Sequence, residues 1–151
     1  NEPTNIGYTD YGSMSRMQYM TFATKGNSEN FGQLSHRSFG VLATSSATRG
    51  VIAGGSGVEP SFPNTNIIEF ITIASEGNTT DFGDLTVARR DGHSTSNSIR
   101  GIFAGGYNPT FQNVIDFVTI ASTGNASDFG DLLTLRRTGA SWGDSHGGLG
   151  D

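Results

Sequence analysis

The sequence contains no cysteine and almost no lysine. Without cysteine there is no disulfide framework, no thiolate nucleophile and no cysteine-ligated metal. Lys25 is the only lysine beside eight arginines, and the net charge is −5. No basic patch is visible, so we do not expect nucleic acid to bind through its phosphates. No apolar run approaches the roughly 20 residues that span a bilayer, so no membrane insertion is expected.

Hydrophobic residues are also scarce, at 34%, whereas glycine is abundant, with 22 residues. That apolar fraction is low for one compact core. It favours several thin packing layers joined by glycine-rich turns. The length of 151 residues suits a single domain.

An internal repeat dominates the sequence. Residues 66–85 align without a gap with residues 113–132, and residues 15–34 form a weaker third copy. The Phe-Gly steps of these copies begin at Phe31, Phe82 and Phe129, so the intervals are 51 and 47 residues. Internal similarity at such a period indicates a repeat architecture.

A pair of glycines forms a second landmark, 23 residues after the first two Phe-Gly steps. Together the landmarks predict a lead-in loop at 1–14 and three units at 15–65, 66–112 and 113–151, the last incomplete or capping, all in one domain. The structural repeat positions are Phe31, Gly32, Leu34, Gly54, Gly55, Phe82, Gly83, Leu85, Gly105, Gly106, Phe129, Gly130 and Leu132.

Each unit is expected to contain about four short strands and no helix. Residues 67–74 are rich in β-branched and aromatic residues, without helical spacing, and both faces of this strand are apolar. A Gly-Asn turn follows, and a short strand ends near residues 81–85. Residues 94–99 and 101–104 supply two more strands. The fold class is therefore all-β.

The order of these features resembles a kelch repeat, the blade of a β-propeller. In residues 90–137, Arg90 and His93 precede a strand that ends at Gly105-Gly106, and a variable loop and a third strand follow. Phe129 and Leu132 take the aromatic and leucine positions. Residues 37–90 have the same order, so the resemblance covers nearly the whole chain. It implies kelch-like propeller blades, three units per chain.

Where the sequence departs from the usual kelch pattern, it resembles a particular subtype of kelch-like repeat. Phenylalanine followed by glycine stands where kelch units carry tryptophan. Such repeats are similar to those of structural proteins of tailed bacteriophages, especially marine ones. The resemblance implies a non-enzymatic structural or receptor-contact protein of a virion (tail, fibre or capsid-associated) that presents variable loops, with a virion or extracellular location. The alternative is a lectin-like carbohydrate-binding module of a surface or secreted protein.

Catalysis is the third alternative, and the sequence offers little for it. Asp-Phe-Gly at 81–83 and 128–130 matches the kinase magnesium motif in letters, but no catalytic-loop or phosphate-loop sequence accompanies it. No nucleophile elbow supports a Ser-His-Asp triad. A kelch-type oxidase would need a Tyr-Cys crosslink, and cysteine is absent. We therefore predict no enzyme, no catalytic residue and no cofactor.

Metal binding is not expected either. His36, His93 and His146 never fall at metal-ligand spacing, and His93 is interpreted as a structural hydrogen-bonding residue. The acidic pairs at 81/84 and 128/131 are too few for calcium, which takes six or more oxygens. They are expected to cap turns through backbone amides.

Four aromatic residues in loops are candidate contacts: Phe62, Tyr107, Phe111 and Trp142. They either stack on sugars or close interfaces between units. The Asn78 and Asn125 sequons lie in turns where asparagine is expected without glycosylation.

Three units fall short of the four to eight blades of a propeller. Residues 145–151 resemble the Gly-Gly strand, and residues 1–5 resemble the loop that follows it. Half-units of two copies would then pair to give a six-bladed ring, or further blades precede residue 1. We expect a homo-oligomer or a larger assembly, with a glycan or receptor as a further partner.

Overall fold

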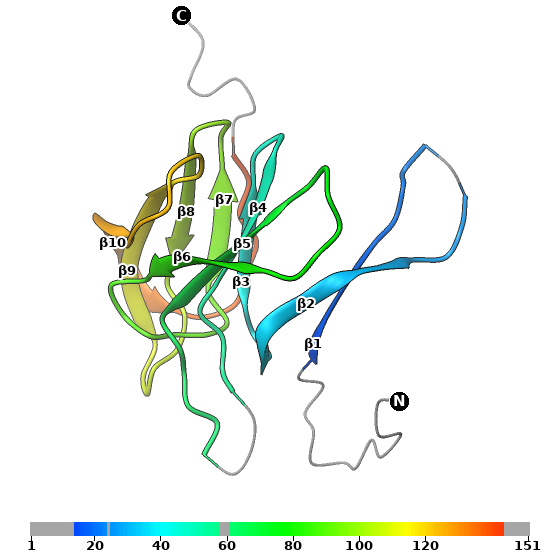
Figure 1. Cartoon of the computed structure of the whole chain (residues 1–151). Helices are drawn as coiled ribbons and strands as arrows, with labels where there is room; N and C mark the ends of the chain where they lie inside the picture. Colours follow the sequence, from blue (N-terminus) through cyan, green and yellow to red (C-terminus); the bar gives the residue numbers. More distant parts are fainter. Residues whose placement is uncertain (1–13, 24, 58–60, 144–151) are drawn as a thin grey trace, which may run out of the picture.

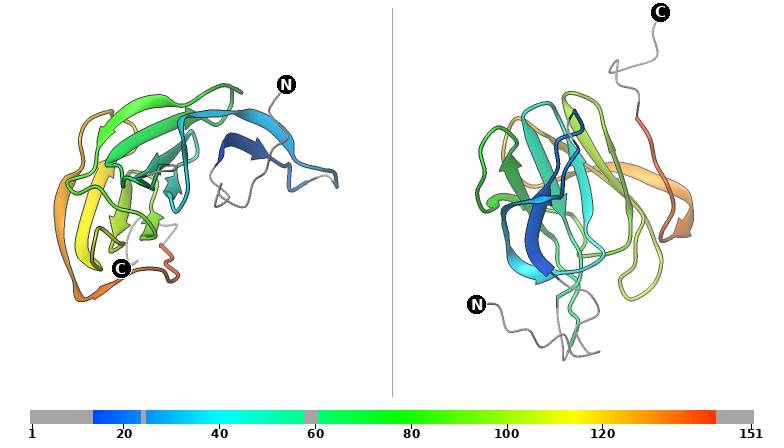
Figure 2. Two further views of the ribbon diagram at one scale, coloured as in Figure 1. Left: turned by 90° about the horizontal axis from the view of Figure 1, so that it is seen from below. Right: turned by 90° about the vertical axis from the view of Figure 1, so that its right-hand side faces the viewer.

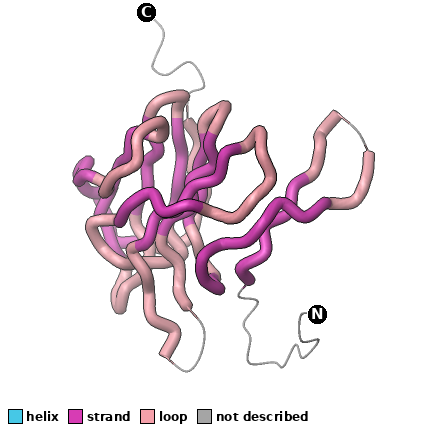
Figure 3. The backbone as a smooth tube through the Cα atoms, in the orientation of Figure 1, coloured by secondary structure: helices cyan, strands magenta, loops and turns pink. Residues whose placement is uncertain are grey.

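The computed structural model describes residues 14–23, 25–57 and 61–143. These residues form ten strands and contain no helix (Figures 1 and 3). The strands are β1 (Met14–Tyr19), β2 (Glu29–Ser38), β3 (Leu42–Ser45), β4 (Arg49–Ala53), β5 (Ile67–Thr72), β6 (Thr80–Asp84), β7 (His93–Ser96), β8 (Arg100–Ala104), β9 (Gln112–Thr119) and β10 (Ser127–Arg136). The all-β prediction is confirmed, and the strands expected at 67–74, 94–99 and 101–104 are present as β5, β7 and β8.

The strands form three antiparallel sheets. Sheet order is β1-β2 in the first, β3-β4-β5-β6 in the second and β7-β8-β9-β10 in the third. In the left view of Figure 2 the sheets follow one another along an arc, with β3 and β7 on its inner side and β6 and β10 on its outer side. Each four-stranded sheet begins within one sequence unit and ends in the next, so the sheets and the units differ in phase.

Each Phe-Gly step lies at a β-bulge. Gln18 pairs with Asn30 and Met17 with Gly32, which leaves Phe31 as the extra residue of β2. The same shift skips Phe82 in β6 and Phe129 in β10. A bulge bends the strand and re-aims a side chain, so the repeated phenylalanine is directed by a local irregularity of the backbone.

The hydrophobic core lies within and between the two four-stranded sheets. Its members are nearly inaccessible aliphatic and aromatic side chains: Leu42, Val51, Ala53, Ile68, Phe82, Leu85, Phe103, Val118 and Ile120. This small set explains how a chain of low hydrophobic content folds, because burying each larger apolar side chain contributes roughly 1.5–3 kcal/mol.

One expectation about β5 needs correction. Both faces were predicted to be apolar, yet Glu69 lies in the middle of this strand and is only 4% exposed. Asp116 takes the same place in β9 and is completely buried. Buried carboxylates need partners, and both have them, as described below.

Candidate functional site

Neighbouring sheets are joined where a Phe-Gly strand edge meets a Gly-Asn turn. At the first junction the outer strand β2 faces the turn between β5 and β6. The Gly77 amide donates to the Phe31 carbonyl at 2.8 Å, and the Thr79 amide donates to the Gln33 carbonyl at 2.9 Å. In return, the Gln33 amide donates to Oδ1 of Asn78 at 3.0 Å. The asparagine of the turn therefore accepts a hydrogen bond from the adjacent sheet.

The second junction repeats these three hydrogen bonds. The Gly124 amide donates to the Phe82 carbonyl at 2.7 Å, and the Ala126 amide donates to the Asp84 carbonyl at 2.8 Å. The Asp84 amide donates to Oδ1 of Asn125 at 3.1 Å. The repeated Phe-Gly and Gly-Asn motifs are thus the two halves of one contact, made between successive sheets.

Glycine is required on the strand edge because the turn lies directly against its backbone. A Cβ atom on Gly32 would overlap the carbonyl oxygen of Gly77, and one on Gly83 would overlap that of Gly124. The adjacent Phe31 and Phe82 are 8% and 2% exposed. Both rings are therefore buried beside the junctions.

The chain that returns from each outer strand passes directly against the backbone of a Gly-Gly pair, which has no side chain in the way. Gly54 has φ +63°, a conformation that favours glycine. The Gly55 amide donates to the Arg89 carbonyl at 2.8 Å, and the Gly106 amide donates to the Arg136 carbonyl at 2.9 Å. The repeated Leu85 lies close to Gly54 and Leu132 close to Gly105. Leu85 is buried, whereas Leu132 and the corresponding Leu34 are half-buried.

Each buried carboxylate binds a backbone amide that follows the outer strand of the preceding sheet or lies in it, and Glu69 also binds a hydroxyl of its own sheet. Glu69 accepts hydrogen bonds from the Ser35 amide at 3.1 Å and the Thr79 hydroxyl at 2.9 Å. Asp116 accepts from the amide and the hydroxyl of Thr86, at 3.2 and 2.6 Å.

Asp116 also forms an ion pair with Arg89 at 2.8 Å, and neither side chain is exposed. A second guanidinium nitrogen of Arg89 donates to the Phe103 carbonyl at 3.1 Å. Our sequence reasoning missed this pair and Glu69. The signal was an acidic residue inside an otherwise apolar strand, Ile-Glu-Phe in one copy and Ile-Asp-Phe in the other.

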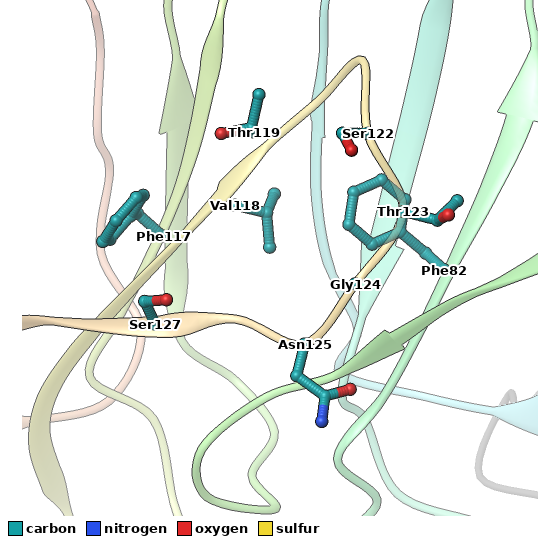
Figure 4. Close-up of a pocket in the computed structure, with 9 residues that line it drawn as sticks. All are labelled: Phe82, Phe117, Val118, Thr119, Ser122, Thr123, Gly124, Asn125 and Ser127. Atoms are coloured by element: carbon teal, nitrogen blue, oxygen red, sulfur yellow. The ribbon is translucent and has the colours of Figure 1, made fainter.

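A pocket of about 370 Å³ lies beside the second junction, and Figure 4 shows Phe82 and Phe117 on either side of Val118. Its nine lining residues are Phe82, Phe117, Val118, Thr119, Ser122, Thr123, Gly124, Asn125 and Ser127. None of them carries a charge. The Gly124 amide and Asn125 Oδ1 are engaged in the junction. The pocket therefore offers hydroxyl groups and ring faces but no acid–base pair.

The third Phe-Gly edge has no turn against it among the described residues. Phe129 is 54% exposed, and a Cβ atom on Gly130 would meet nothing within 4 Å. Phe129 therefore differs from Phe31 and Phe82, which are buried. Its ring instead lies edge-on to Phe117, with centroids 5.9 Å apart.

The loops that follow the two Gly-Gly pairs lie side by side and form an aromatic–arginine cluster. Asn64 Nδ2 donates to the Tyr107 carbonyl at 3.0 Å and so joins the loops. The rings of Tyr107 and Phe111 are 6.1 Å apart. The Arg137 guanidinium lies 5.5 Å from each of these two ring centroids.

Arg90 extends the cluster towards the first loop. Its guanidinium lies 4.9 Å from the Tyr107 ring and 5.3 Å from the Phe39 ring, and Phe39 packs edge-on against Phe62 at 6.2 Å. Three of the four predicted loop contacts are therefore brought together. Trp142 is not, because it lies in the segment beside β7, where the Ser141 hydroxyl donates to the Ser94 carbonyl, and it is 87% exposed.

The histidines that were considered as catalytic or structural residues do not form a complete site among the described residues. Ser35 Oγ lies 3.0 Å from Nδ1 of its neighbour His36, but Nε2 of His36 is buried without a hydrogen bond to any described residue, so no acid orients this ring. The expected structural hydrogen bond of His93 is also missing at Nδ1 within the described part. His146 lies outside the described residues.

The acidic pairs do not cap turns as predicted. No hydrogen bond from a described residue reaches the side chains of Asp81, Asp84, Asp128 or Asp131; the Asp84 amide instead donates to Asn125. Within residues 14–23, 25–57 and 61–143, no group of three or more histidine, aspartate and glutamate side chains is arranged to hold a metal ion. No helix able to cross a membrane is found in that same part of the chain.

Tyr19 links the first sheet to the first Gly-Asn turn. Its hydroxyl donates to Glu76 at 3.0 Å, and a carboxylate oxygen of Glu29 lies 3.3 Å from the same hydroxyl. The hydrogen bond to Glu76 and the negative charges of both carboxylates raise the pKa of Tyr19 from 10.0 to about 12. The neutral phenol is therefore the form that the first junction binds.

No protein-family model matches the chain, and a search of curated proteins finds no match either.

Proposed function

We propose that the chain is a non-enzymatic structural or receptor-contact protein, built of kelch-like propeller blades, that presents its post-Gly-Gly loops as a component of a phage virion. The observation that carries the contact role is the aromatic–arginine cluster. Two loops far apart in the sequence converge there, joined by the hydrogen bond between Asn64 and Tyr107.

The sheet arrangement supports the blade interpretation. The two four-stranded sheets are meanders of the same order, with their first strands together on the inner side of the arc. The Ser94 hydroxyl of β7 donates to the Ala43 carbonyl of β3, and Ser96 donates to Ser45 at 2.7 Å. Radial succession of four-stranded sheets is the arrangement of a propeller.

The cluster has the chemistry of a contact surface. Phe111 is 46% exposed, and Arg137 is exposed beside it. Aromatic rings provide rigid area at low entropic cost, and arginine binds carboxylates through paired hydrogen bonds. Loops on a rigid scaffold are also where binding residues usually lie.

The first test is the location of the protein. We expect it to co-purify with intact virions at fixed stoichiometry. Its absence from particles, together with production by a host that carries no prophage, would contradict the virion role.

A carbohydrate-binding module is the second candidate, because aromatic faces next to arginine also suit sugar rings that carry carboxylates. A glycan array distinguishes the two. Binding that Phe111→Ala and Arg137→Ala abolish, and that Trp142→Ala leaves unchanged, would favour this candidate. Trp142 is the matched control, because it is an exposed aromatic residue outside the cluster.

A further inference from the structure

Within the part of the chain that the structure describes, each end of the arc carries one half of the junction without the other half against it. At one end, residues 25–28 repeat the Gly-Asn turn, and we call them the N-terminal turn. At the other end, residues 129–133 repeat the Phe-Gly edge, and we call them the C-terminal edge. Gly26 and Asn27 correspond to Gly77 and Asn78 at the interval of 51 residues, and both are exposed.

We propose that the C-terminal edge of one chain binds the N-terminal turn of a second copy, with the hydrogen bonds of the two internal junctions. The repeat intervals specify the partners. The Gly26 amide donates to the Phe129 carbonyl, and the Asp131 amide donates to Oδ1 of Asn27. The Ser28 amide donates to the Asp131 carbonyl. This inference goes beyond the proposed function and does not depend on it.

The buried carboxylate also has a counterpart at the open end. Gln18 of β1 stands where Glu69 and Asp116 stand in the other sheets, and the Ser28 hydroxyl donates to its Oε1 at 2.8 Å. This contact repeats the one from Thr79 to Glu69. Gln18 is thereby oriented to accept the amide of Leu133, as Glu69 accepts the amide of Ser35.

Both ends expose large apolar side chains. Phe129 is 54% exposed and Leu133 fully so at the C-terminal edge, whereas Met20 and Phe22 are 63% and 98% exposed beside the N-terminal turn. At the internal junctions the equivalent Phe31 and Phe82 are buried. Burial of these surfaces favours association through the hydrophobic effect.

The charges of the two open surfaces are opposite in sign. At the first internal junction Glu76 of the turn and Glu29 of the edge both contact the Tyr19 hydroxyl, and at the second the neutral Thr123 meets an acidic edge. The remaining turn carries Lys25, the only lysine, and the remaining edge carries Asp128 and Asp131. Opposite charges on the two open surfaces steer them together and disfavour other pairings.

The described ends of the arc fit closure of two copies into a ring. The Asp91 amide donates to the Gly40 carbonyl at 2.8 Å, and the Thr138 amide donates to the Asp91 carbonyl at the same distance. Residues 138–143 therefore lie in line with the first strands β3 and β7. Among the described residues, the β1-β2 sheet has two strands where each of the other sheets has four. Residues 138–143 of one copy would then lie at the inner side of the partner's β1-β2 sheet, and a head-to-tail contact that closes gives a ring.

Sedimentation equilibrium of the 151-residue chain tests the association. We expect twice the monomer mass of 15.9 kDa at micromolar concentration. Asn27→Ala and Gly130→Val should each weaken the association about tenfold or more, because one removes an acceptor and the other fills the space of the partner's turn. Ser98→Ala, in an exposed turn away from both surfaces, should leave it unchanged. Circular dichroism confirms that each variant is folded.

Lys25 provides a second readout that does not depend on a variant's folding. A carbodiimide joins lysine amines to carboxylates in direct contact, and the chain has one lysine. Peptide mapping of the crosslinked dimer should find Lys25 joined to Asp128 or Asp131, and Lys25→Arg should lose the link. A monomer at 100-fold higher concentration, or a dimer whose Lys25 is joined to another acid, would overturn the proposal. A series of higher multiples with the same link would support the contact and overturn closure into a two-copy ring.

Discussion

Phe82 and Phe129 hold the same position in two copies of one repeat, and their surroundings are opposite. Both rings lie edge-on to the aromatic residue of the neighbouring strand, at 6.0 and 5.9 Å. Both follow the same β-bulge. Yet Phe82 is 2% exposed and Phe129 is 54% exposed. The local structure is therefore the same, and only the presence of a next sheet differs.

The difference separates the interactions that form within one sheet from those that form between neighbouring sheets. The bulge and the aromatic pair form within one sheet. Burial of the phenylalanine, the need for glycine and the hydrogen bonds of the asparagine arise between sheets. Substitutions at an internal position and at its counterpart on the open edge distinguish the two contributions. Their effects are measured by urea unfolding in the Asn27→Ala background, which keeps the chain monomeric if the docking described above holds.

The largest difference is expected between Arg89 and Arg136. Arg89→Met leaves Asp116 buried without its cation and should lower the free energy of unfolding by about 3–5 kcal/mol. Arg136 is exposed and bonds Thr134 beside it, so Arg136→Met should change stability by about 0.5 kcal/mol or less. The double variant Arg89→Met/Asp116→Leu should recover part of the loss. Equal effects of the two arginine substitutions would contradict this account.

The two phenylalanines should differ almost as much. Phe82→Ala removes a buried ring and should cost about 3–5 kcal/mol. Phe129→Ala removes a half-exposed ring and one aromatic contact, which should cost about 1 kcal/mol. If Phe129→Ala proved as destabilising as Phe82→Ala, the outer edge would be buried in the monomer.

A smaller difference is expected between Gly83→Val and Gly130→Val. Both glycines have positive φ, +148° and +139°, so both variants share the backbone strain. Only at Gly83 does the new side chain overlap the turn of the next sheet. Gly83→Val should therefore be the less stable variant by about 1–3 kcal/mol. Equal losses of stability would mean that backbone strain alone accounts for the requirement for glycine at Gly83.

The smallest effect concerns Tyr19 at the first junction. Its pKa of about 12 is raised above the unfolded value of 10.0, so its contribution is complete below pH 10 and is lost as the pH rises to about 12. Glu76→Gln should move the pKa back towards 10.0. Tyrosinate absorbance during an alkaline titration measures this shift. An unchanged titration in Glu76→Gln would rule out the carboxylate as the cause.

The sequence predicted which segments form strands, because the repeat located them and β-branched residues marked β5 and β9, but β7 ends at Ser96 and not at Ile99. It also identified the glycines and phenylalanines of the junction. It did not identify Glu69 and Asp116 as buried residues. A carboxylate inside an apolar strand is stable only with polar partners, and the sequence does not show that Thr79, Thr86 and Arg89 lie next to these two side chains. Nor did it distinguish Phe129 from Phe82, since their local sequences are identical and exposure depends on what lies across the edge.

Amide hydrogen exchange, resolved by residue, tests most directly whether the Phe-Gly edge binds the Gly-Asn turn of the next sheet. At a concentration where the chain is monomeric, the Gln33 and Asp84 amides should be protected by Asn78 and Asn125, and the Asp131 amide should exchange rapidly. Asn125→Ala should expose the Asp84 amide and leave that of Gln33 protected. Equal exchange of the Asp84 and Asp131 amides in the monomer would contradict the account.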